Sequence, residues 1–157
     1  MPSSTAYTNG IEAILVGTVD LDTTALKSTL LKSTYWPDPD QEFVDIAGTT
    51  MDIAGHECDA TGFTGGFAGA DRLAATVVTT EQTASNRVVT IISDQTWTAI
   101  GGASNNTLSG VAIIREITND GASIPIVFCL FSSNLTTNGS DILIDWDGTN
   151  GNLRWTA

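Results

Sequence analysis

The stretch DILIDWDGTNGNLRWTA, residues 141–157, decides the fold class because apolar and acidic residues alternate along its first half. In an extended chain, successive side chains point to opposite faces. One face therefore carries Ile142, Ile144 and Trp146, and the other carries Asp141, Leu143, Asp145 and Asp147. This period of two is typical of a β-strand that is buried on one face only.

The residues after this strand predict a reversal of the chain. The segment GTNG (148–151) contains glycine and asparagine, which tolerate the positive φ angles of tight turns. The returning segment NLRWT places Leu153 and Trp155 on a shared face. The sequence therefore predicts a C-terminal hairpin, with Trp146 and also Trp97 covering the core.

The same alternation recurs along the chain between turn-forming residues. It predicts strands at 12–18, 25–33, 72–80, 87–93, 110–117, 124–131 and 141–147. The runs on either side of the polar tip EQTASN predict a second hairpin. Turn signals spaced by roughly 8–15 residues are typical of a sandwich or barrel. We therefore expect an all-β, jelly-roll-like β-sandwich with long loops and little helix.

Length and cysteine content are consistent with a single domain over residues 1–157, with a polar N-terminal arm at 1–10. A chain of 157 residues buries roughly 68–70% of its unfolded surface, so it needs neither disulfides nor a metal to fold. The two cysteines, Cys58 and Cys129, do not make a disulfide framework. Cys129 lies in the apolar run IPIVFCLF, where we expect a small buried hydrophobic residue.

The charge balance argues against two classes of partner. The formal net charge is −12, from 18 acidic and six scattered basic residues. Nucleic acids and anionic membranes are bound through clustered Lys and Arg, so we expect neither as a partner. The N-terminal residues lack a secretory pattern, and the run at 124–131 is too short to span a bilayer. We expect synthesis in a cytoplasm.

A metal site is the first chemical alternative for the acidic C-terminal region. Asp145, Asp147 and Thr149 partly match a calcium-binding loop, but Asn150 stands where glycine is required. Two carboxylates on one strand face lie roughly 6–7 Å apart, which does not suit shared chelation. The run DPDQE (38–42) is interpreted as a solvated loop. We expect no metal and no cofactor.

Catalytic chemistry has few candidate residues. His56 is the single histidine. Glu57 and Cys58 adjoin it, but sequence neighbours on a strand point to opposite faces. A cysteine nucleophile needs a base close in space, and the chain offers no second histidine. Nothing in the sequence selects a pair of acidic residues for acid–base catalysis. We expect a protein that is not an enzyme.

Aromatic residues in two loops are the candidate partner-binding residues: Tyr35, Trp36, Phe63 and Phe67. TYWPDPD (34–40) sets two of them before a proline loop, where aromatics either join interfaces or close the end of a sandwich. TGFTGGFAGAD (61–71) lacks the lysine of a phosphate-binding loop. Its phenylalanines either fold back onto the sheet from a flexible loop or anchor the loop on a partner.

The order of these pieces resembles a known class of protein. The segments are TALKSTLL, YWPDPDQEFVDIAG, TGFTGGFAG, VTIISDQTWT, GVAIIREI and NGSDILIDWDGTNGNLRWTA. From about residue 12 to the C-terminus this order is similar to small virion structural proteins of tailed bacteriophages, of the head decoration or cement type.

The resemblance implies a non-enzymatic protein made in the host cytoplasm and located on the outer capsid surface of the virion. There it would bind the major capsid protein and copies of itself, as a homo-oligomer, and stabilise the head. The family supplies no catalytic residues. The alternative is a tail-associated adhesin or carbohydrate-binding β-module, in which Tyr35, Trp36 and Asp38 would form a stacking platform.

Overall fold

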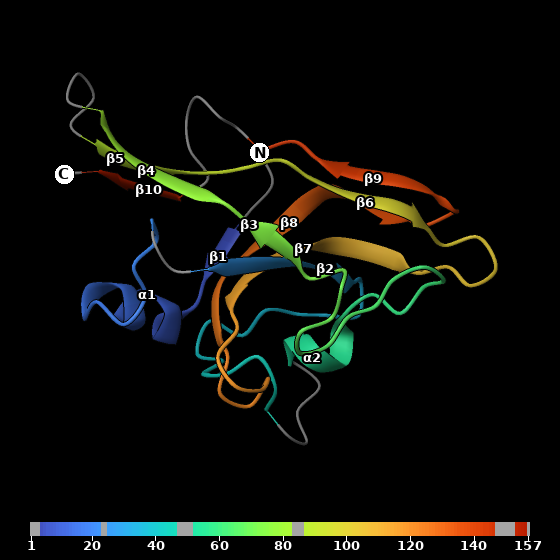
Figure 1. Cartoon of the computed structure of the whole chain (residues 1–157), viewed down its shortest axis with the longest axis horizontal. Helices are drawn as coiled ribbons and strands as arrows, with labels where there is room; N and C mark the ends of the chain where they lie inside the picture. The colour runs from blue at the N-terminus through green and yellow to red at the C-terminus, as the bar shows by residue number, and fades with distance from the viewer. Residues whose placement is uncertain (1–3, 23–24, 47–51, 83–86, 147–152, 157) are drawn as a thin grey trace.

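A computed structural model describes residues 4–22, 25–46, 52–82, 87–146 and 153–156. It is 43% strand and 9% helix, in several antiparallel sheets that do not close into a barrel within the described residues. In chain order the elements are β1 (Ser4–Ala6), α1 (Thr8–Leu15), β2 (Leu26–Lys32), α2 (Ile53–His56), β3 (Leu73–Ala75), β4 (Val77–Gln82), β5 (Arg87–Ile92), β6 (Gln95–Ile100), β7 (Thr107–Arg115), β8 (Ile124–Thr136), β9 (Ser140–Ile144) and β10 (Leu153–Thr156) (Figure 1). The mostly-β prediction is confirmed.

The largest sheet has five strands in the order β1-β8-β7-β2-β3. At its centre, β7 pairs with both neighbours, so that Val111 lies opposite Leu30 on one side and Cys129 on the other. Almost every residue of β7 is buried. Its near-continuous apolar sequence fits this position, because a central strand covered on both faces has no side exposed to water.

Neighbouring residues of the central strands belong to two different apolar clusters. Leu30, Ile113 and Val127 belong to the first, together with Trp97 and Trp146. The second cluster contains the next residue along each of these strands, Leu31, Ile114 and Phe128. Successive side chains of a strand point to opposite faces, so the five-stranded sheet is buried on both sides. The predicted burial of Trp97 and Trp146 is confirmed.

Two smaller sheets contain the remaining strands, in the orders β10-β5-β4 and β6-β9. The hairpin predicted around EQTASN is confirmed, since β4 and β5 pair from Val77↔Ile92 to Gln82↔Arg87. The predicted C-terminal hairpin is wrong. Instead β9 pairs with β6, and β10 pairs with β5. Period-two alternation determines which face of a strand is buried, but it does not determine which strand becomes its neighbour.

The strand predicted at 12–18 is wrong, because α1 is a helix there. Gly10 and Ala13 form its buried face against β8, and a Cβ on Gly10 would lie 2.5 Å from the carbonyl oxygen of Pro125. Small residues thus allow the helix to approach the sheet. Gly17 follows the helix with φ +75°, which makes it a helix-ending residue and not a sign of a strand.

Short elements also form where the sequence predicted none. Within the expected polar arm, β1 pairs with β8 through Ser4↔Cys129. The segment around Trp97 forms β6, and α2 is a single turn capped by Asp52, whose carboxylate accepts a hydrogen bond from the Gly55 amide (2.8 Å). Among the described residues, no helix has the length and apolar character needed to cross a membrane.

Candidate binding surface

Tyr35, the first of the four candidate residues, lies in the core. Only 3% of its surface is exposed, and its ring packs edge-on against Phe128 with 5.2 Å between centroids. Its hydroxyl donates a hydrogen bond to Gln41 Oε1 (3.0 Å) and is also hydrogen-bonded to the hydroxyl of Tyr7. Burial raises the pKa of Tyr35 to about 12. Tyr35 therefore holds the loop in place, and its ring is not accessible to a partner.

Trp36, the next residue, is 73% exposed. The loop that follows it is fixed by hydrogen bonds from the Thr8 amide to Pro39 O (2.8 Å) and from Gln41 Nε2 to Phe43 O (2.8 Å). Trp36 is therefore a large apolar ring presented to solvent on a well-anchored backbone. Such a ring loses little conformational freedom when it is covered, which favours tight binding.

The glycine-rich loop separates its two phenylalanines. Phe63 is half-buried and packs against the first apolar cluster, whereas Phe67 is 41% exposed. Two carboxylates accept hydrogen bonds from the backbone of this loop, one between the two phenylalanines and one after Phe67. The Gly66 amide donates to Glu57 Oε2 (2.5 Å), and the Ala68 amide donates to Glu116 Oε1 (3.0 Å). The loop is thus tied to the body of the protein at two points.

The same carboxylates surround Arg72, whose side chain is completely buried. Its Nε donates to Glu57 Oε1 (2.7 Å), and its Nη1 donates to Glu116 Oε1 (2.9 Å). Asp120 accepts from Nη1 at 2.5 Å and from Nη2 at 3.1 Å. Burial alone would lower the pKa of Arg72, but the hydrogen bonds to Asp120 and Glu57 outweigh it and hold the pKa above its usual range.

This arginine cluster, formed by Arg72, Glu57, Glu116 and Asp120, was missed by the sequence analysis. Its members come from three separate parts of the chain, around residues 57, 72 and 116–120, and Arg72 looked like one of six scattered basic residues. Its position directly after the glycine-rich loop is the one signal in the sequence. Because the cluster binds the loop through Gly66 and Ala68, it determines where Phe67 is presented.

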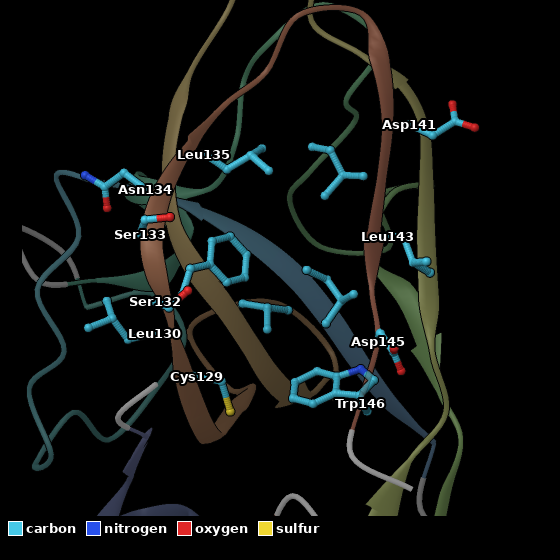
Figure 2. Close-up of a pocket in the computed structure, with 14 residues that line it drawn as sticks. Cys129, Leu130, Ser132, Ser133, Asn134, Leu135, Asp141, Leu143, Asp145 and Trp146 are labelled. Atoms are coloured by element: carbon cyan, nitrogen blue, oxygen red, sulfur yellow. The ribbon is translucent and has the colours of Figure 1, made fainter. Parts of the chain in front are cut away.

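An open cleft of about 650 Å³ separates β8 from β9. Its apolar lining includes Cys129, Leu130, Phe131, Leu135, Leu143 and Trp146. Figure 2 shows the two strands on either side of this cleft, with Trp146 at its lower end and Asp141 pointing away from it. Burial raises the pKa of the Cys129 thiol to about 11, so at neutral pH it is a protonated, apolar part of the wall.

The residues that the sequence analysis weighed for catalysis have structural partners. His56 Nδ1 donates to the carbonyl oxygen of Asp52 (2.9 Å), and Glu57 is bound to Arg72. Burial raises the pKa of the Cys58 thiol, which disfavours the nucleophilic thiolate. Within the described ranges, no three His, Cys, Asp or Glu side chains are placed to hold a metal ion. Asp147, Thr149 and Asn150 lie outside those ranges.

Comparison with known proteins finds no match: no protein-family model, no curated protein and no solved structure is significantly similar to this chain. A functional assignment has to rest on the chain's own residues and their geometry.

Proposed function

We propose that this chain is a non-enzymatic virion structural protein that decorates the outside of a bacteriophage head. It binds the major capsid protein and copies of itself, and thereby stabilises the particle. The observation that carries the proposal is Trp36, an exposed ring on a loop anchored to the core through Tyr35 and Gln41. Exposed aromatic anchors on fixed backbone are the residues that dominate protein–protein binding energy.

The whole-chain order of sequence pieces supports the same proposal, as does the surface charge. A decoration protein accumulates in many free copies before it meets the capsid. A formal net charge of −12 keeps such copies soluble and apart. Decoration then depends on many weak, symmetric contacts, so each copy needs only a modest affinity.

We also propose that the sheets belong to one jelly-roll-like β-sandwich. The first apolar cluster supports this, because it combines Leu30 and Ile113 of the five-stranded sheet with Trp97 of β6 and Ile142 of β9. A shared core between two sheets is the defining feature of a sandwich. Such a body places the loops carrying Trp36 and Phe67 at its surface, where they would contact the capsid.

The alternative, a carbohydrate-binding tail module, has less support. Its stacking platform required Tyr35 and Trp36 side by side with Asp38. Tyr35 is buried and hydrogen-bonded to Tyr7, so Trp36 is left as the one accessible ring of that pair.

The test is co-sedimentation of the purified protein with phage heads stripped of their decoration, and separately with tails and with host polysaccharide. We expect binding to heads, lost in Trp36→Ser and reduced in Phe67→Ser. Leu15→Ser is the matched control, since Leu15 is an equally exposed apolar residue on α1. Binding to tails or polysaccharide with none to heads would overturn the proposal in favour of the adhesin.

A further inference from the structure

The cleft between β8 and β9 is bordered by strand edges to which, among the described residues, no further strand is paired. β9 pairs with β6 along one edge, and no described strand pairs with its other edge. On β8, the described part of β1 covers the outer edge from Val127 to Cys129. Further along, residues 131–134 bulge out between the pairs Leu108↔Leu135 and Gly110↔Leu130. Unpaired strand edges offer rows of N–H and C=O groups to another extended chain.

The side chains around these edges are apolar and accessible. Leu130 and Leu135 on β8 are partly exposed, and Leu143 on β9 is 62% exposed. Figure 2 shows Leu135 pointing from β8 toward the opposite strand, Leu130 on the outer side of β8, and Leu143 on the strand opposite. Contiguous apolar groups at an open sheet edge mark an interaction site, because their exposure is costly unless a partner covers them.

Two acidic residues, Asp141 on β9 and Asp145 directly after it, indicate the chemistry of that partner. Asp141 and Asp145 flank Leu143 on the same face, and neither Lys nor Arg is among the described residues that line the cleft. Asp145 is exposed, whereas Asp141 Oδ1 accepts a hydrogen bond from the Ala99 amide of β6 (2.8 Å), so that its carboxylate lies on the outer face of β9, on the side of β6. A segment lying along this edge therefore meets an acidic surface, with no basic side chain among the described lining residues.

A second copy of this chain fits the edge poorly. If two β9 strands paired antiparallel about Leu143, Asp141 of each copy would lie opposite Asp145 of the other. Like charges directly opposite each other in a sheet are destabilising. A basic partner segment would turn the same positions into attractive pairs.

We propose that this cleft binds an extended segment of another protein, which adds a strand to β9. Side chains on one face of the segment would enter the cleft beside Ile142 and Trp146 and are apolar. The alternate side chains would lie opposite Asp141 and Asp145 and are Lys or Arg. Main-chain hydrogen bonds give such a contact its affinity, and the alternating side chains give it specificity. The surface is separate from the Trp36 loop, so the inference goes beyond capsid decoration.

The test uses a fluorescent peptide in which lysine alternates with valine, titrated with the full-length protein and followed by anisotropy. Two matched peptides serve as controls: one with glutamate in place of lysine, and one with N-methylated valines that cannot donate edge hydrogen bonds. We expect the lysine peptide to bind and both controls to fail. Hydrogen exchange should slow at residues 131–134 or 140–144 when the lysine peptide is bound.

Variants of the protein test the charged contacts and the apolar contacts of the peptide separately. Asp145→Lys should weaken binding of the lysine peptide roughly threefold to tenfold, as expected for reversal of an exposed ion pair. Glu81→Lys, an equal charge change on exposed β4, should leave it unchanged. Leu143→Ser should weaken binding without a change in circular dichroism.

Three results would overturn the proposal. The first is binding of the glutamate or N-methylated peptide with the affinity of the lysine peptide. The second is absence of any binding at millimolar protein. The third is concentration-dependent self-association that Asp145→Lys or Leu143→Ser abolishes, which would assign the edge to a second copy.

Discussion

The hydroxyl of Tyr7 is hydrogen-bonded to the hydroxyl of Tyr35, 28 residues further along the chain. Because Tyr35 donates its own proton to Gln41, Tyr7 is the donor in this pair. The contact ties the residue between β1 and α1 to the loop that presents Trp36. Both rings belong to the second apolar cluster, so the pair is shielded from water.

Alkaline pH should destabilise the protein through these two tyrosines. Burial raises the pKa of Tyr35 to about 12 and that of Tyr7 further, from an ordinary value of 10.0. Between pH 10 and 12 the folded state keeps protons that the unfolded state releases, so the free energy of unfolding falls as pH rises. Each tyrosine contributes about 1.4 kcal/mol per pH unit in that window.

Urea unfolding measured from neutral pH to about pH 12 checks this expectation. The double variant Tyr7→Phe, Tyr35→Phe should lose most of the slope above pH 10, because phenylalanine does not ionise. Ultraviolet titration of tyrosinate in the folded wild-type protein gives an independent reading. If both hydroxyls ionised near the ordinary pKa of tyrosine while the protein remained folded, this would contradict the burial of the two tyrosines.

Removal of the Arg72 side chain should cost about 3–5 kcal/mol in the free energy of unfolding. Arg72→Ala leaves the carboxylates of Glu57, Glu116 and Asp120 close together without a cation. Arg72→Lys should also destabilise, since a single ammonium cannot reproduce the fork of guanidinium hydrogen bonds. Chemical denaturation measures both, and limited proteolysis should show earlier cleavage near Phe67. Arg115→Ala, at a half-buried arginine outside the cluster, is the control, and an equal cost there would contradict the prediction.

Trp146→Ala should destabilise the protein by about 3–5 kcal/mol, the usual range for truncation of a large core aromatic. Its indole is buried in the first apolar cluster, and Nε1 donates to Gln95 Oε1 (2.6 Å). Asp145→Asn, one residue before it, should cost little because Asp145 faces solvent. Thermal melts with and without a chelator complete the comparison. A sharp drop in melting temperature when a chelator is added would contradict this prediction and would indicate a metal site at the acidic residues.

Gly10→Ala should destabilise by about 1–3 kcal/mol, the range for overpacking at a close contact. The new Cβ would lie 2.5 Å from Pro125 O and 2.9 Å from Ile126 Cα, and backbone atoms of a paired strand cannot move aside. Gly121→Ala is the matched control, because its nearest neighbour, Asn119 Oδ1, lies at 3.4 Å. Thermal denaturation distinguishes the two, and equal melting temperatures would show that α1 does not pack as described.

The sequence predicted the strands whose own pattern determines them. Period-two alternation located β9 and the burial of Trp146, and β-branched runs around a polar tip located the β4–β5 hairpin. The prediction from sequence failed where a contact with a distant segment determines the conformation of an element or its pairing. α1 is a helix because Gly10 and Ala13 fit against β8, and β10 pairs with β5 because that edge is available.

The residues of the candidate binding surface also divide into those predictable from the local sequence and those determined by distant contacts. Because Trp36 lies before a proline loop, the sequence correctly predicted that it is accessible. The same reasoning wrongly predicted that Tyr35 is accessible. Contacts with the distant residues Tyr7 and Phe128 bury Tyr35 and distinguish it from Trp36. Arg72 was invisible for a similar reason, since the carboxylates that surround it are supplied by residues 57, 116 and 120.

The pairing of β1 with β8 also limits when the protein can fold. Ser4 has its partner at Cys129, and the edge of β5 is completed only by β10. During synthesis the first strand must wait until β8 has left the ribosome, and the three-stranded sheet must wait for β10. Such long-range closure slows folding and leaves strand edges unprotected in the nascent chain. We expect the native sheets to assemble only late in synthesis, so that production in cells depends on chaperones that bind extended, apolar segments.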